Sequence, residues 1–100
     1  MPSVHWILPC LLLCSLAVSA RDLDQDEALR LRQSGTIRPV AELMQAALQR
    51  HPAARLLEVE LEEGRGRYVY EFELLTADGL VRELEFDAAT GQLLKDREDD

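Results

Sequence analysis

Residues 68–94, YVYEFELLTADGLVRELEFDAATGQLL, decide the fold of this chain. Apolar side chains recur at every second position, at Tyr68, Tyr70, Phe72 and Leu74 and then at Leu84 and Phe86. This period is typical of a β-sheet with one buried face. Asp78-Gly79 and Thr90-Gly91 stand where the alternation stops, and such dipeptides form turns. The stretch therefore predicts an antiparallel meander.

An earlier strand precedes this meander. Leu57, Val59 and Leu61 alternate with Glu58, Glu60 and Glu62, so one face of the strand is apolar and the other carries carboxylates. If Gly64-Arg65 forms a two-residue type II′ turn, Leu61 faces Tyr68 and Val59 faces Tyr70. Buried residues would then meet buried residues across the hairpin.

The next hairpin needs a longer loop. A two-residue Asp78-Gly79 turn would pair inward with outward residues, whereas a loop of Ala77-Asp78-Gly79 with a left-handed Gly79 pairs Phe72 with Leu84. A short fourth strand is expected around residues 92–95. The sequence DREDD, residues 96–100, has nothing to bury and is expected to fray.

Two helices are predicted before the sheet. Residues 23–33 offer Asp24 as an N-cap, and Gly35 should end this helix. The second helix has a continuous apolar stripe, made of Val40, Leu43, Met44, Ala47 and Leu48. The predicted fold class is α+β, with two N-terminal helices packed on one face of an antiparallel three- to four-stranded meander sheet.

Residues 1–20 are typical of a cleavable signal peptide. They carry no charged side chain, are rich in apolar residues, and end in Val18-Ser19-Ala20, which suits signal peptidase. We expect cleavage after Ala20, a periplasmic location, and no stable membrane anchoring afterwards. Cys10 and Cys14 both lie in the removed segment. The expected organisation is a signal peptide (1–20), a helix and loop (21–38), a helix with sheet (39–95) and an acidic tail (96–100).

The charge of the chain narrows the class of partner. It has 19 acidic and 11 basic residues, a formal net charge of −8. A nucleic acid or an anionic membrane would require a basic face, so neither is expected as a partner. A field of this sign attracts basic proteins and cations.

Catalytic chemistry is not expected. Beyond residue 20 the chain has a single serine, Ser34, a single histidine, His51, and no cysteine. A nucleophile with its base would need the sole copy of each residue, and an ordinary zinc site lacks ligands. We therefore predict no catalytic residue, no cofactor and no dedicated metal site.

The acidic residues are arranged in a pattern that solubility alone does not require. In the register above, eight carboxylates project from one face of three adjacent strands, namely Glu58, Glu60, Glu62, Glu71, Glu73, Glu83, Glu85 and Asp87. This face could be an ordinary solvated surface, because runs of charge usually are. It could instead be a docking surface for a basic partner, or a weak site for divalent cations.

The order of these elements resembles the PepSY family, whose domains occur in propeptides of secreted metallopeptidases and in exported bacterial proteins. The resemblance covers residues 39–94 and rests on Glu58-Val59-Glu60-Leu61, Tyr68-x-Tyr70-x-Phe72, Asp78-Gly79, Leu84-x-Phe86-Asp87 and Thr90-Gly91-x-Leu93. It implies a non-catalytic exported module that binds and modulates a protease or a membrane sensor domain. The alternative is a periplasmic protein that binds or buffers divalent cations with its acidic face. We interpret Asp87 and Thr90 as turn formers that cap backbone amides.

Overall fold

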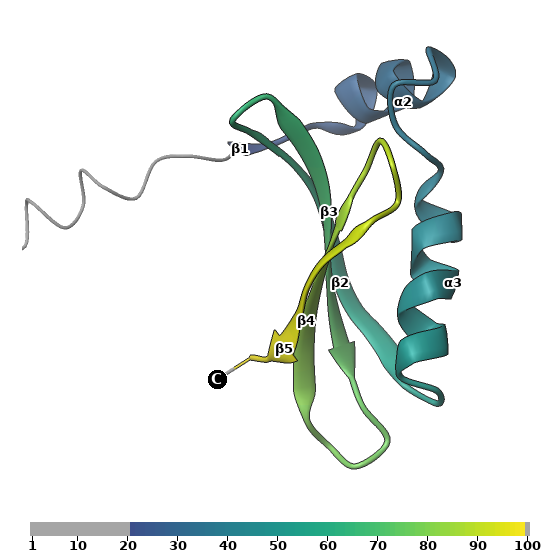
Figure 1. Cartoon of the computed structure of the whole chain (residues 1–100), viewed down its shortest axis with the longest axis vertical. Coiled ribbons are helices and arrows are strands. Elements are labelled where there is room, and N and C mark those ends of the chain that lie inside the picture. The colour runs from purple at the N-terminus through teal and green to yellow at the C-terminus, as the bar shows by residue number, and fades with distance from the viewer. Residues whose placement is uncertain (1–20, 100) are drawn as a thin grey trace, which may run out of the picture.

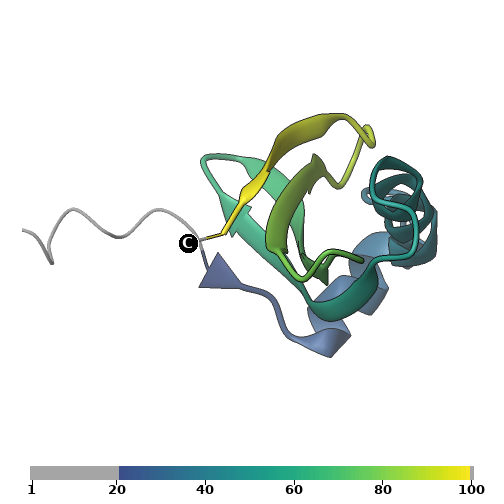
Figure 2. The same ribbon diagram turned by 90° about the horizontal axis from the view of Figure 1, so that it is seen from below.

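The computed structural model describes residues 21–99, so the predicted signal peptide lies outside the described residues. These residues form a five-stranded antiparallel sheet with two helices on the same side of it (Figures 1 and 2). In chain order the elements are β1 (Arg21–Asp22), α2 (Gln25–Gln33), α3 (Val40–Arg50), β2 (Arg55–Gly64), β3 (Arg67–Leu75), β4 (Val81–Asp87) and β5 (Leu93–Glu98). The α+β class is confirmed, but the sheet has five strands rather than the predicted three to four.

Local capping explains where the helices begin and end. Asp24 accepts a hydrogen bond from the N–H of Glu27, whose side chain reaches back to the Asp24 N–H, a complete capping box. After Gln33 the chain enters Gly35 with φ of 79°, a left-handed conformation that glycine adopts without steric cost. Pro39 precedes α3, and Pro52 follows its C-cap residue His51. Both predicted helices are therefore confirmed.

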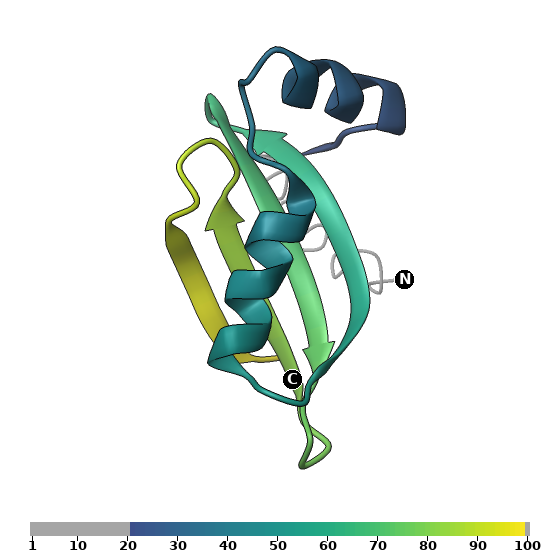
Figure 3. The same cartoon turned by 90° about the vertical axis from the view of Figure 1, so that its right-hand side faces the viewer.

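The core lies between α3 and the sheet (Figure 3). Leu43 and Ala47 of α3 are buried against Phe72 of β3 and Leu84 of β4, which are also fully buried. Tyr70 is 5% exposed, and its hydroxyl donates to the carbonyl of Arg38 at 2.7 Å. The alternating apolar positions of β3 and β4 thus form the buried face, as predicted, whereas Val59 of β2 stays 38% exposed.

Helix α2 differs from α3 in how it packs. It lies beyond the N-terminal end of α3 (Figure 1), and none of its residues is fully buried. Ala28 and Leu31 pack partly against the core, whereas Leu29 stays 44% exposed. The expectation that two helices pack on one sheet face therefore describes α3 well, while α2 covers only the end of the sheet.

The β2–β3 hairpin corrects the predicted register. Leu61 pairs with Tyr70, and Gly64 pairs with Arg67, so the two-residue turn is Arg65-Gly66 and not Gly64-Arg65. Both turn residues have positive φ, 56° and 72°, as a type I′ turn requires. The error shifts every pair by two residues, and a shift of two leaves every side chain on its predicted face.

A β-bulge also changes the start of β2. Leu56 pairs with Leu74 and Glu58 pairs with Glu73, which leaves Leu57 as the extra residue. Leu57 is 47% exposed, so its predicted place on the buried face is wrong.

The β3–β4 loop agrees with the prediction. Phe72 pairs with Leu84, and Gly79 has a φ of 87°. The Thr76 N–H donates to the Leu80 carbonyl at 2.8 Å, which closes the three-residue loop 77–79.

Strand β5 is longer than expected and corrects the interpretation of the C-terminal segment. Asp96, Arg97 and Glu98 belong to this strand and pair with β4, so these residues do not form a frayed tail. Asp96 lies opposite the buried Leu84, and its side chain is only 9% exposed. Among residues 21–99, no helix is both long enough and apolar enough to cross a membrane.

Candidate functional site

The eight predicted acids lie on the face of the sheet away from α3, which we call the acidic face: Glu58, Glu60, Glu62, Glu71, Glu73, Glu83, Glu85 and Asp87. Strand pairing sets Glu60 beside Glu71 and Glu71 beside Glu85. Like charges directly opposite each other destabilise a sheet by roughly 0.2 to 1 kcal/mol a pair. The structure therefore brings these carboxylates together across adjacent strands in spite of their repulsion.

Two basic residues of β5 extend this face and were not assigned to it from sequence. Lys95 pairs with Glu85 in the strand register, with Nζ 3.2 Å from the carboxylate, and Arg97 lies 3.3 Å from Glu83. Lys95 and Arg97 neutralise part of the negative charge of the β4 acids Glu83 and Glu85, so the uncompensated negative charge concentrates on β2 and β3. The alternation of Lys95, Asp96 and Arg97 could have indicated this, had the strand been continued beyond residue 95.

Glu71 and Glu83 share a proton at the centre of the acidic face. A hydrogen bond with Glu83, together with burial and the neighbouring carboxylates, raises the pKa of Glu71 to about 9. The same hydrogen bond, with help from Lys95 and Arg97, lowers the pKa of Glu83. Near neutral pH Glu71 is thus the protonated donor and Glu83 the carboxylate acceptor.

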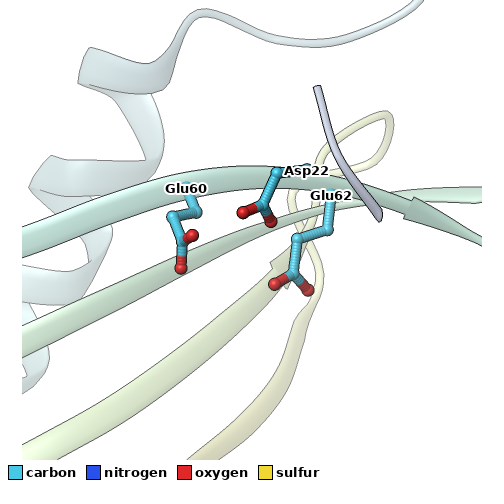
Figure 4. A group of neighbouring side chains, drawn as sticks. All are labelled: Asp22, Glu60 and Glu62. Atoms are coloured by element: carbon cyan, nitrogen blue, oxygen red, sulfur yellow. The ribbon is translucent and has the colours of Figure 1, made fainter. Parts of the chain in front are cut away.

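A second group of acids lies where β1 meets β2. Figure 4 shows the carboxylates of Asp22, Glu60 and Glu62 gathered on the same side of the sheet. A hydrogen bond with Asp22, burial and repulsion from the neighbouring acids raise the pKa of Glu60 to about 7. Burial and the charge of Asp22 raise the pKa of Glu62 as well. Asp22 was not among the predicted site residues, because a two-residue strand has no periodicity to detect.

Both groups have the donor chemistry of a hard cation site. Within each trio, Asp22, Glu60 and Glu62 or Glu71, Glu83 and Glu85, one oxygen per residue lies within 4.8 Å of the others. Calcium and magnesium prefer carboxylate oxygens, and a cation would relieve the repulsion that raises these pKa values. Exposed acids often gather in this way without a metal, so geometry alone does not make either trio a metal centre.

Asp87 has a structural task within the acidic face. Its Oδ1 accepts the N–H groups of Ala89 at 2.9 Å and Thr90 at 3.0 Å, and the Thr90 hydroxyl accepts the Gln92 N–H at 3.2 Å. The prediction that Asp87 and Thr90 cap turn amides is confirmed. One carboxylate oxygen of Asp87 is therefore already occupied by backbone amides.

On the opposite face, Asp96 ties β5 to α3 and β4. Its carboxylate is 2.9 Å from Arg50 Nε, 2.9 Å from His51 Nε2 and 2.8 Å from Arg82 Nε. Burial alone would raise the pKa of Asp96, but the hydrogen bonds from Arg50, His51 and Arg82 outweigh it and lower the pKa to about 2. This clamp explains why Asp96 and the residues that follow it in β5 do not fray.

The residues considered for catalysis lie apart. The Ser34 hydroxyl donates to the Leu31 carbonyl at 3.0 Å as part of the α2 C-cap, whereas His51 contacts Asp96 beyond the far end of α3. At 1.5 Å per residue, a helix the length of α3 spans about 16 Å. Ser34 and His51 are therefore helix-end residues, and they form no nucleophile–base pair.

Comparison with known proteins agrees with the resemblance. The family model described as "Peptidase propeptide and YPEB domain", PepSY, matches residues 39–97, which run from the start of α3 into β5. No curated protein and no solved structure matches the chain. Domains of this family are propeptide- or inhibitor-type modules, generally non-catalytic and generally in exported proteins.

Proposed function

The chain belongs to the PepSY family, and we propose that it is a periplasmic, non-catalytic module that binds and modulates a protease or a membrane sensor domain. Family membership supports a regulatory role for the domain in general terms. The predicted signal peptide supports export. The acidic face supports contact with a basic protein surface.

One observation carries this proposal: the acids concentrate on the face of the sheet that α3 leaves uncovered. Hydrogen bonds between carboxyl groups, burial and repulsion among the neighbouring acids raise the pKa of Glu60 to about 7 and of Glu71 to about 9, so the charged form of these acids is disfavoured on this face. Neutralisation by a basic partner would relieve that repulsion. Complementary charge also steers association and disfavours wrong partners.

The test is a capture experiment with a matched control. The wild-type chain, processed by export, is compared with a variant in which Glu60, Glu71, Glu73 and Glu85 are replaced by Gln. The control removes four acids elsewhere, by Asp26→Asn, Glu42→Gln, Asp78→Asn and Glu98→Gln, so the formal net charge changes equally. Captured proteins are identified by mass spectrometry at low and at physiological salt.

We expect one periplasmic or membrane protein to be captured by the wild type and by the control, and at least tenfold less by the acidic-face variant. Capture should weaken as salt rises, because exposed charges are screened over about 8 Å at physiological ionic strength. Equal capture by all three chains would show that the acidic face is a solvated surface.

Divalent-cation binding is the second candidate, favoured by the two carboxylate trios. Calorimetric titration of the wild type with Ca²⁺ should show binding that strengthens as pH rises from 6 to 9, because the shared protons must leave. Asp22→Asn should weaken the β1–β2 trio, while Asp26→Asn serves as its control. Heat of binding that is absent, or unaffected by Asp22→Asn, would reject this trio as a cation site.

A further inference from the structure

The outer edge of β2 is paired over only part of its length. β1 pairs with Glu62 and Glu63, and the Leu23 N–H donates to the Leu61 carbonyl at 2.9 Å. From Glu60 back to the start of β2, no strand within residues 21–99 pairs on this side. Unpaired strand edges present N–H and C=O groups that another extended chain can bind.

The backbone of Val59 faces this open edge. In an antiparallel strand, residues two apart direct their backbone groups to the same side. The carbonyl of Leu61 is bonded to Leu23 on the outer side, so the N–H and C=O of Val59 point outward too. The bulge at Leu57 interrupts the strand just beyond, so the usable edge is short and centred on Val59.

An apolar groove lies along this edge on the helix side. Its volume is about 400 Å³, and Leu29 and Val59 line it with 44% and 38% of their surface exposed. The rest of its lining comes from the first helix, the start of α3 and the sheet: Gln25, Ala28, Arg32, Val40, Glu60, Leu61 and Tyr70. The groove exists because α2 covers the end of the sheet without closing on β2.

The other side of the same edge is acidic. Asp22, Glu58 and Glu60 lie there on the acidic face (Figure 4 shows two of them). A segment lying along β2 would direct alternate side chains to the two sides, because successive side chains of a strand point to opposite faces. One set would enter the apolar groove, and the other would meet carboxylates.

We propose that an extended segment of alternating apolar and basic residues binds here as an added strand on β2. Its apolar side chains fill the groove beside Leu29 and Val59, its basic side chains pair with Glu58 and Glu60, and its backbone bonds to Val59. The inference rests on the proposed binding function and names the surface and the partner chemistry. Such β-strand addition is a common mode of peptide recognition, in which backbone bonds give affinity and alternate side chains give specificity.

Charge determines both the occupant and its orientation. A second copy of this chain would place Glu58 and Glu60 against the same acids, in a chain of net charge −8, and like charges across strands repel. Arg32 at the groove disfavours a basic side chain on the helix side. Apolar residues toward the helices and basic residues toward the acidic face are therefore the complementary arrangement.

The experiment titrates the exported chain with three short capped peptides. The first alternates Lys and Val, the second has the same composition with all Lys before all Val, and the third alternates Lys and Val with methylated backbone nitrogens. Affinity is measured by fluorescence anisotropy, and amide hydrogen exchange of Val59 is followed by NMR. Leu29→Glu tests the groove, and Leu80→Glu, at a loop leucine of similar exposure, 39%, is its control.

We expect the alternating peptide to bind at least tenfold more tightly than the other two and to slow exchange of the Val59 amide at least tenfold. Leu29→Glu should weaken this binding at least tenfold, while Leu80→Glu leaves it unchanged. Thermal unfolding checks that both variants fold, and both leucines are exposed enough for the fold to tolerate the change.

Three results would overturn the inference. Equal binding of the alternating peptide and of the peptide with all Lys before all Val would show that charge alone causes binding. The proposed function would then stand, but strand addition on β2 would be rejected. Unchanged binding by Leu29→Glu would remove the groove from the interface. A dimer of the free wild type that Leu29→Glu dissociates, detected by light scattering, would assign the edge to a second copy.

Discussion

Asp96→Asn should remove most of the energy of the clamp that joins β5 to α3. The pKa of Asp96 falls from its ordinary value of 3.8 to about 2, because the hydrogen bonds from Arg50, His51 and Arg82 outweigh burial. One pKa unit corresponds to about 1.4 kcal/mol. The shift therefore implies roughly 2 kcal/mol after a discount for the half-exposed Arg50.

The lowered pKa of Asp96 determines how the stability difference between wild type and variant changes with pH. A carboxylate with a lower pKa in the folded state stabilises the fold above its unfolded pKa, and this contribution is lost as pH falls through the folded pKa. Asp96→Asn should thus lower the free energy of unfolding by about 2 kcal/mol at pH 7, or lower Tm by roughly 10 °C. The gap to wild type should close between about pH 4 and pH 2.

Urea unfolding followed by circular dichroism at several pH values measures this gap. Asp26→Asn, at an exposed acid in the first turn of α2, is the control and should change stability by less than about 0.5 kcal/mol. A gap that stays constant from pH 7 to pH 2, or one no larger than that of the control, would refute the clamp.

The remaining predictions concern the acidic face, the core and the leader. Glu71→Gln should stabilise the fold on the order of 1 kcal/mol at pH 8 and not at pH 4, because the raised pKa of the Glu71 carboxyl makes the wild type less stable as pH rises. Equal effects at both pH values would contradict proton sharing between Glu71 and Glu83. Phe72→Ala should lower the free energy of unfolding in urea by about 3 kcal/mol or more, since Phe72 is fully buried, while Val69→Ala on the acidic face should lower it by under about 1 kcal/mol. Equal losses would show that the buried and exposed faces of the sheet are assigned the wrong way round. The exported protein should begin at Arg21 by intact mass, and a membrane-bound species that retains Met1 would reject the signal peptide.

Much of the fold could be predicted because it is encoded locally. The apolar stripe of α3 and the period of two in β3 and β4 decide which side chains are buried, whatever lies beyond them. Capping by Asp24 and the turn at Gly79 depend on neighbouring residues only, so they too were predictable. The composition of the acidic face followed from the same alternation.

What the sequence left open depends on contacts between distant residues. A shift of two residues in the β2–β3 hairpin keeps every side chain on its face, so alternation cannot distinguish Arg65-Gly66 from Gly64-Arg65 as the turn. Asp96 interrupts the apolar pattern of β5, and only its partners Arg50 and Arg82, on another helix and strand, make it a strand residue.

The candidate binding edge is likewise a product of tertiary structure. No local signal indicates that β1 ends at Asp22, or that α2 packs at the end of the sheet and leaves a groove beside Val59. The sequence by itself determined the faces of the sheet, because side-chain period is a local property of the backbone. Among residues 21–99, tertiary packing decided which edge of the sheet stays open and which acids stay unneutralised, because both depend on where β1, α2 and β5 pack.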